Sequence, residues 1–272
     1  MFGAIIGDII GSPYEFGDRP PWDFTPLVAD QANWTDDTLM TLAVADAMMT
    51  LKGDRQNAGD AENVIAATMR HYARTYPLPR GGYGSKFLSW LFSPGQGAYG
   101  SFGNGSAMRV SSAGWLFGTL DDTLDWAAAT ARVTHNHPEG IAGAQAIAGA
   151  IYLLRSGVSS TSVRDWTATR FGYDLSLDLQ ESQAKYKPNT ACSGTVPEAI
   201  IAFIESTDFE TAIRNAVSYG GDTDTLAAIT GSLAEAYYVI PPALHDMAIK
   251  RLGVPLATII DRFEQSRTPC AA

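Results

Sequence analysis

The sequence contains very little cysteine. Only Cys192 and Cys270 occur among its 272 residues. Two cysteines are too few for a disulfide framework, and their spacing does not fit a zinc knuckle. We therefore expect a protein of a reducing compartment and assign neither thiol a catalytic role.

Basic residues are also scarce. Lysine and arginine number 19 against 29 aspartates and glutamates, which gives a net charge of −10. Binding to nucleic acids or anionic membranes is driven by clustered basic side chains that release counterions. The composition therefore argues against a nucleic-acid or membrane-surface partner, and bound cations would neutralise part of the negative charge.

The sequence has no long apolar run. The longest weakly polar stretch covers residues 140–154 and is interrupted by Gln145, so it is shorter than the roughly 20 apolar residues of a membrane span. Residues 1–11 are apolar but contain Asp8 and lack the basic start of a secretory signal. We expect a cytoplasmic protein in which residues 140–154 form a buried helix whose small residues let neighbouring helices approach.

Strand-like alternation is scarce, whereas apolar residues recur at helical spacing in many segments. The pattern predicts an all-α fold, and the length favours a single compact domain over residues 1–272, with a monomer as the default expectation. The polar segment 176–188 is expected to be a mobile surface loop. Helices are predicted at 39–49, 123–132, 163–170, 197–204, 209–218, 226–239 and 242–251.

Two short acidic clusters precede predicted helices near opposite ends of the chain. They are Thr35-Asp36-Asp37 and Asp222-Thr223-Asp224-Thr225. Either cluster alone could be a helix N-cap, but one carboxylate is enough for a cap, and adjacent carboxylates repel each other. Carboxylates and threonine hydroxyls are the hard oxygen ligands that Mg²⁺ or Mn²⁺ takes. If the fold joins the clusters, the metal ligands are predicted to be Thr35, Asp36, Asp37, Asp222, Asp224 and Thr225.

The N-terminal segment has glycines at four-residue spacing, Gly3, Gly7 and Gly11. This spacing predicts a tightly packed helix that ends near Glu15. For the acid inside this apolar helix, Asp8, a structural pairing is favoured, and for Glu15 a place in a functional site. Burial would raise the pKa of Glu15, and a nearby metal would lower it.

A glycine-rich loop at residues 100–106 precedes a further apolar run. Such a loop offers backbone N–H groups to phosphate oxygens, although the Lys-Ser/Thr ending of a P-loop is missing. The alternative is a plain turn that buries Phe102. His135 and His137 stand before the predicted buried helix without a cysteine or third histidine nearby, so a ligand-contacting histidine is favoured over a zinc site, with a surface cap as the alternative.

Five motifs occur in the order GDIIGSPYE, WTDDT, GNGSAMR, THNHP and GGDTDT. In this order they make the chain similar to the ADP-ribosylglycohydrolases, from Gly3 to about Phe263. The resemblance implies an orthogonal helical globule with a central dinuclear Mg²⁺ or Mn²⁺ site. It also implies an enzyme that removes ADP-ribose from modified protein side chains or from related small ADP-ribosyl compounds.

The resemblance also implies roles for individual residues. The two acidic clusters would hold the metal pair, and Glu15 would lie near the substrate ribose. Proton transfer in catalysis is assigned to Glu15 or Asp37. The pyrophosphate and ribose would be lined by Gly103, Asn104, Gly105 and Ser106, with His135 reaching the same ligand.

The acceptor is not decided by these motifs. Similarity to bacterial members favours ADP-ribosylated arginine, and serine, O-acetyl-ADP-ribose and poly(ADP-ribose) are the alternatives. Two other interpretations are alternatives to an ADP-ribosylglycohydrolase. One is a non-catalytic ADP-ribose-binding module. The other takes residues 222–225 as the nucleophile loop of a haloacid dehalogenase-like phosphatase, but that loop must follow a buried strand, and residues 215–221 are not a strand-like apolar run.

Overall fold

The computed structural model of the chain describes residues 1–53 and 60–269, so Cys270 lies outside the described residues. Within these residues the structure is built from helices, turns and two isolated bridges, with no β-strand. The predicted all-α fold is confirmed. The helices are α1 (Phe2–Gly11), α2 (Asp36–Gly53), α3 (Ala61–Thr75), α4 (Ser85–Phe92), α5 (Gly105–Met108), α6 (Ala113–Leu116), α7 (Leu120–Arg132), α8 (Pro138–Arg155), α9 (Ser160–Phe171), α10 (Leu179–Lys185), η2 (Cys192–Gly194), α11 (Val196–Ile204), α12 (Phe209–Val217), α13 (Thr223–Glu235) and α14 (Pro242–Ser266).

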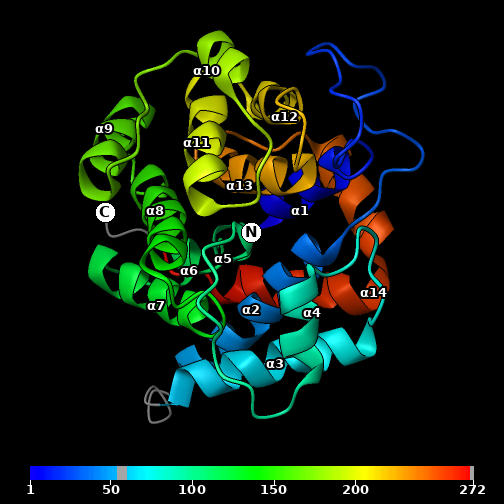
Figure 1. Cartoon of the computed structure of the whole chain (residues 1–272), viewed down its shortest axis with the longest axis vertical. Coiled ribbons are helices and arrows are strands. Elements are labelled where there is room, and N and C mark those ends of the chain that lie inside the picture. Colours follow the sequence, from blue (N-terminus) through cyan, green and yellow to red (C-terminus); the bar gives the residue numbers. More distant parts are fainter. Residues whose placement is uncertain (54–59, 270–272) are drawn as a thin grey trace.

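Helices α1 and α13 lie side by side in the middle of the molecule (Figure 1). Their backbones approach closely because glycines of α1 face α13. A Cβ atom added at Gly3 would lie 2.1 Å from the carbonyl oxygen of Gly231, and one added at Gly7 would lie 1.9 Å from that of Ala227. The predicted tight packing of the glycine ladder is thus confirmed, and it brings the end of α1 beside the start of α13.

The predicted buried helix at residues 140–154 is also confirmed. Helix α8 covers it, and most of its small residues are buried. A Cβ added at Gly149 would lie 2.4 Å from the ring of Trp166, and one added at Gly143 would lie 2.5 Å from Sγ of Cys192. Through these contacts, α9 and the segment before α11 pack against α8.

Several segments differ from the sequence-based expectation, among them α1, which ends at Gly11 and not near Glu15, and α13, which ends at Glu235 and not at residue 239. The segment 176–188 contains α10, which begins where the Asp178 carboxylate accepts the backbone N–H of Glu181. Helix α4 stands between the glycine-rich stretches. Helix α14 continues past residue 251, with a break at Gly253 (φ 68°). Helices as short as α4 and α10 have few residues in which to show a period, so their pattern is weak.

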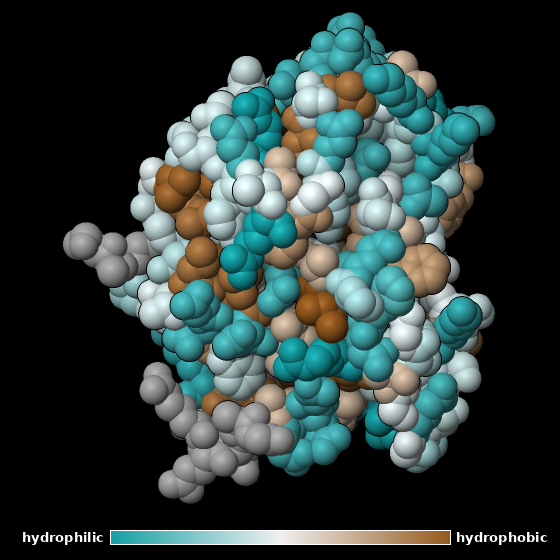
Figure 2. Space-filling model, turned by 60° about the vertical axis from the view of Figure 1, so that its left-hand side comes forward, coloured by the Kyte–Doolittle hydropathy of each residue, from teal (hydrophilic) through white to brown (hydrophobic). Residues whose placement is uncertain are grey.

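The surface mixes polar and apolar residues. On the face shown in Figure 2, hydrophobic residues form separate small patches among hydrophilic ones. Among residues 1–53 and 60–269, no helix is long and apolar enough to cross a membrane.

Candidate active site

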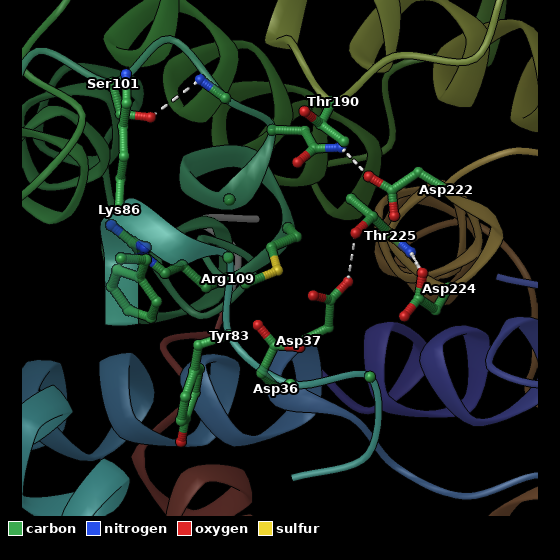
Figure 3. Close-up of a pocket in the computed structure, with 18 of the residues that line it drawn as sticks. Asp36, Asp37, Tyr83, Lys86, Ser101, Arg109, Thr190, Asp222, Asp224 and Thr225 are labelled. Carbon is green, nitrogen blue, oxygen red and sulfur yellow. Dashed lines mark hydrogen bonds between the residues drawn. The ribbon is translucent and has the colours of Figure 1, made fainter. Parts of the chain in front are cut away.

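The two acidic clusters meet at the starts of α2 and α13. The Thr225 hydroxyl donates a 2.8 Å hydrogen bond to Oδ2 of Asp37, across 188 positions of sequence (Figure 3). Asp37, Asp222 and Asp224 are buried around this contact. The fold therefore brings the clusters into one site, as the shared-site hypothesis requires.

The start of α2 is held by the buried carboxylate of Asp8. It accepts the Thr35 N–H at 2.9 Å, the Thr35 hydroxyl at 2.8 Å and the Thr38 N–H at 3.1 Å, and the Thr38 hydroxyl donates to it as well. Burial raises the pKa of Asp8 to about 6, and these donors oppose the rise. The structural role predicted for Asp8 is confirmed, because it satisfies donors at the N-terminus of α2.

The start of α13 is held by contacts from the loop after α1 and the loop before α5. Gly220 and Gly221 have φ values of 75° and 72°, a left-handed conformation that favours glycine. The Gly221 carbonyl accepts the N–H of Phe16 at 2.7 Å, and the Asp222 carboxylate accepts the side-chain amide of Asn104 at 2.7 Å. The glycine pair thus turns the backbone so that Asp222 faces both the loop before α5 and the loop after α1.

The helix that precedes Asp222 also excludes the interpretation of residues 222–225 as a haloacid dehalogenase-like nucleophile loop. The residues before the Gly220-Gly221 turn form α12, which ends at Val217, and not a buried strand. A haloacid dehalogenase-like nucleophile loop requires a strand at this position.

Glu15 belongs to the same cluster of carboxylates. One oxygen each from Glu15, Asp222 and Asp224 lies within 4.8 Å of the other two, which is close enough for all three to hold one cation. The side chain lies against Gly81, where an added Cβ would be 2.9 Å from Oε2 of Glu15. Burial, and then the charges of Asp222 and Asp8, raise the pKa of Glu15, while Arg80 opposes the rise.

The buried negative charge has no basic counterpart. Burial raises the pKa values of Asp36, Asp37 and Asp224 well above the ordinary value, and repulsion between neighbouring carboxylates adds to the effect. Within the described part of the chain, no lysine or arginine forms an ion pair with them. Buried charges of this kind are normally paired or coordinate metals, so this oxygen-only set fits divalent cations.

Two of the predicted site residues face away from the cavity. The Thr35 hydroxyl donates to Asp8 and accepts the Asp37 N–H at 3.1 Å. The Ser106 hydroxyl donates to the Gly140 carbonyl at 2.7 Å. Both side chains are fully buried and outside the cavity wall, so in this structure they act as supports for their neighbours.

The carboxylates form one side of a cavity of about 520 Å³. This size lies within the range of small-molecule pockets. The loop around Gly103, Asn104 and Gly105 lines the same cavity and meets the carboxylates where Asn104 contacts Asp222, and the His135 ring lies against the two glycines. Phe102 is 51% exposed, so the alternative in which the loop is a plain turn that buries Phe102 is wrong.

Several cavity residues were not singled out from the sequence. Tyr83 and Phe87 come from the α4 region, which was not predicted as a helix. Arg109 ends the GNGSAMR motif but was given no role. It is 1% exposed, and burial lowers its pKa to about 10. The sequence signal for Arg109 is that this arginine ends a motif next to the predicted ligand-binding loop.

Comparisons with known proteins agree with this architecture. The family model of the ADP-ribosylglycohydrolases matches residues 1–267. The mouse ADP-ribosylhydrolase ARH3 is 25% identical over 314 residues, covering 88% of this chain and 82% of its own length. The ADP-ribosylarginine hydrolase Tri1 of Pseudomonas putida is 25% identical over 264 residues, covering 88% of this chain and 69% of its own. A solved ADP-ribosylglycohydrolase-related protein complex has the same fold, with a TM-score of 0.67, 24% identity and 97% coverage of both chains. The chain belongs to the ADP-ribosylglycohydrolase family.

Proposed function

We propose that the protein is a metal-dependent hydrolase that cleaves the glycosidic bond between ADP-ribose and its acceptor. The observation that carries the proposal is the meeting of the two acidic clusters, marked by the Thr225–Asp37 contact, at the wall of a cavity. A glycine-rich loop lines the same cavity beside the carboxylates. This arrangement suits a substrate that has a ribose at one end and a pyrophosphate beyond it.

The carboxylates would hold two divalent cations, Mg²⁺ or Mn²⁺. The proposed ligands are Asp36, Asp37, Asp222, Asp224 and Thr225, together with Thr35 if its hydroxyl turns away from Asp8. When bound, the cations supply Lewis-acid polarisation and a more acidic water. Glu15 lies close enough to Asp222 and Asp224 to share a cation with them.

The remaining steps rest on the chain's own side chains. Glycosidic cleavage builds positive charge at the anomeric carbon of the ribose, and the surrounding carboxylates stabilise that charge. Glu15 is partly exposed and lies beside Asp222 and Asp224, a position from which its carboxyl group can transfer a proton to the leaving group or from water. Asp37 is the second residue proposed for proton transfer.

The glycine loop would orient the substrate. Gly105 has no side chain, so a pyrophosphate can approach its backbone N–H group, and Gly103 and His135 line the same space. Fixing the distant half of the substrate places the glycosidic bond against the carboxylates, and such orientation accounts for much of the rate gain in enzymes.

ADP-ribosylated arginine is the favoured acceptor. The similarity to a protein named as an ADP-ribosylarginine hydrolase supports this choice. Serine-linked ADP-ribose, O-acetyl-ADP-ribose and poly(ADP-ribose) are the alternative substrates.

The test is a panel of defined peptides carrying ADP-ribose on arginine or serine, with O-acetyl-ADP-ribose and poly(ADP-ribose) beside them. Release of ADP-ribose is followed with Mg²⁺, with Mn²⁺ and with chelator. We expect cleavage of the arginine-linked peptide that stops in chelator. Tight ADP-ribose binding without cleavage of any panel member would instead identify a non-catalytic binding module.

A further inference from the structure

Arg109 is a buried cation without a carboxylate partner. Its side chain is 1% exposed and forms no ion pair among the described residues. Nη2 donates to Oγ1 of Thr134 at 2.7 Å and more weakly to the Thr130 carbonyl at 3.5 Å. A guanidinium has only donors, so the Thr134 oxygen must accept in this contact.

The Thr134 hydroxyl must therefore use its hydrogen elsewhere. Oγ1 lies 2.7 Å from Nδ1 of His135, and the side chain is fully buried. In the described part of the chain, no other acceptor contacts this hydroxyl. If Nδ1 carried a proton, the hydroxyl hydrogen would be buried without an acceptor, which is an unfavourable arrangement. The geometry thus makes Thr134 the donor and Nδ1 the acceptor.

His135 is held as a neutral ring. Burial and the nearby Arg109 charge keep its pKa far below the ordinary value. In a neutral imidazole whose Nδ1 accepts, the single proton stands on Nε2.

Nε2 faces the two glycines of the cavity loop. A Cβ added at Gly105 would lie 3.3 Å from Nε2, and one added at Gly103 would lie 3.6 Å away. No described residue forms a hydrogen bond with Nε2, although His135 lines the cavity. Glycine at these positions leaves the nitrogen open to a ligand.

We propose that Thr134, held by Arg109, is a positioning residue that fixes the proton of His135 on Nε2, so that His135 donates a hydrogen bond to a pyrophosphate oxygen of the bound substrate. The identity of that ligand rests on the proposed function. The tautomer does not, because it follows from contacts within the free protein. A pyrophosphate oxygen only accepts hydrogen bonds, so a histidine protonated on Nδ1 would face it with a lone pair.

The first test is ¹⁵N NMR of the histidine ring in the ligand-free, full-length protein. We expect a pyrrole-type Nε2 and a pyridine-type Nδ1 for His135. Thr134→Val removes the hydroxyl at nearly constant shape and is expected to mix the tautomers, while Thr134→Ser restores the wild-type pattern. A protonated Nδ1 in the wild-type protein, or an unchanged pattern in Thr134→Val, overturns the inference.

Thr130→Val is the matched control. Thr130 is also fully buried, and its hydroxyl donates to the Ala127 carbonyl on α7, away from His135. This variant loses one buried hydrogen bond, whereas Thr134→Val loses the two that join Arg109 and His135, and it should keep the wild-type tautomer. A similar tautomer change in both variants would show a general loosening of the region and contradict a positioning role. If Thr134→Val does not fold, the wild-type spectrum and Thr134→Ser still decide the matter.

The second test is calorimetric titration with ADP-ribose. Thr134→Val should weaken binding by about tenfold, the value of one hydrogen bond to a charged group, whereas Thr134→Ser and Thr130→Val should not. If wild type does not bind ADP-ribose, the proposed function fails while the NMR result stands. If wild type binds and Thr134→Val binds equally well, the positioning role is wrong and the proposed function survives.

Discussion

Thr225 and Asp37 are joined by a 2.8 Å hydrogen bond in which the Thr225 hydroxyl donates to the Asp37 carboxylate. One residue belongs to the first turn of α13 and the other to the first turn of α2. The contact orients a carboxylate oxygen of one acidic cluster toward the other. Burial and neighbouring carboxylates raise the pKa values of Asp37 and Asp224. Ionising these carboxyl groups without a bound cation therefore lowers the stability of the folded protein.

The Asp37 carboxylate should be essential for cation binding. Asp37→Asn keeps the shape but removes a charge, and we expect Mg²⁺ or Mn²⁺ affinity and turnover each to fall at least ~100-fold, since a direct ligand should matter more than the supporting groups whose loss costs about 10–100-fold. Asp46→Asn is the control, because Asp46 lies on the same helix but contacts Tyr72 and Arg262 instead. Calorimetric titration and ADP-ribose release measure both. Near-normal turnover of Asp37→Asn with full metal content would contradict the assignment.

The Thr225 hydroxyl should also support the cation site. Thr225→Val removes both a proposed neutral ligand and the donor that orients Asp37, and we expect metal affinity to fall by at least about 10–100-fold, the range for orienting groups alone. Thr230→Val removes a buried hydroxyl from the same helix, one that donates to the Ala199 carbonyl instead. The control should cost about 1 kcal/mol of stability and leave metal affinity unchanged. Equal metal affinities in the two variants would count against a role for Thr225.

The cation-free protein should gain stability when Asp37 is neutralised. Because burial and neighbouring carboxylates raise the pKa of Asp37 above 3.8, the folded state binds more protons than the unfolded state above that pH. The free energy of unfolding of the cation-free protein therefore falls as the pH rises from 3.8 through the raised pKa of Asp37. In chelator, Asp37→Asn should have the higher melting temperature at pH 7, with the difference shrinking on acidification.

Excess Mg²⁺ is the internal control for that comparison. Cation binding to the folded state stabilises wild type by mass action and should remove or reverse the advantage of the variant. Thermal melts at several pH values, with and without Mg²⁺, provide the measurement. A wild-type protein that is more stable than Asp37→Asn in chelator at pH 7 would show that the buried charge is compensated within the chain.

The glycine ladder should be intolerant of side chains. Gly7→Ala would put a methyl group 1.9 Å from the Ala227 carbonyl oxygen and force α1 away from α13. Overpacking of this kind costs about 1–3 kcal/mol or more, and the shift should also lower metal affinity because the start of α13 carries the second acidic cluster. Gly97→Ala, which meets nothing within 4 Å, should leave stability and metal affinity unchanged. Urea unfolding and calorimetry would reveal whether the two variants differ.

Much of this protein is determined by the sequence. The helical period and the four-residue glycine spacing specify which face of a helix is buried, so the all-α fold and the packing of α1 follow from local pattern. The acidic clusters and the glycine loop follow from residue chemistry. The sequence did not predict α4 and α10, because these helices are too short to show a clear helical period.

Only the tertiary structure decides which of these side chains meet. Thr35 is adjacent to Asp36 in the sequence, yet its hydroxyl binds Asp8, while Glu15 joins Asp222 across the chain. Likewise, nothing in the GNGSAMR or THNHP motif shows that Arg109 contacts Thr134 and, through it, His135. The physical reason is that periodicity sets the direction of a side chain relative to its own helix, whereas the meeting of distant helix ends depends on how closely the helices between them pack.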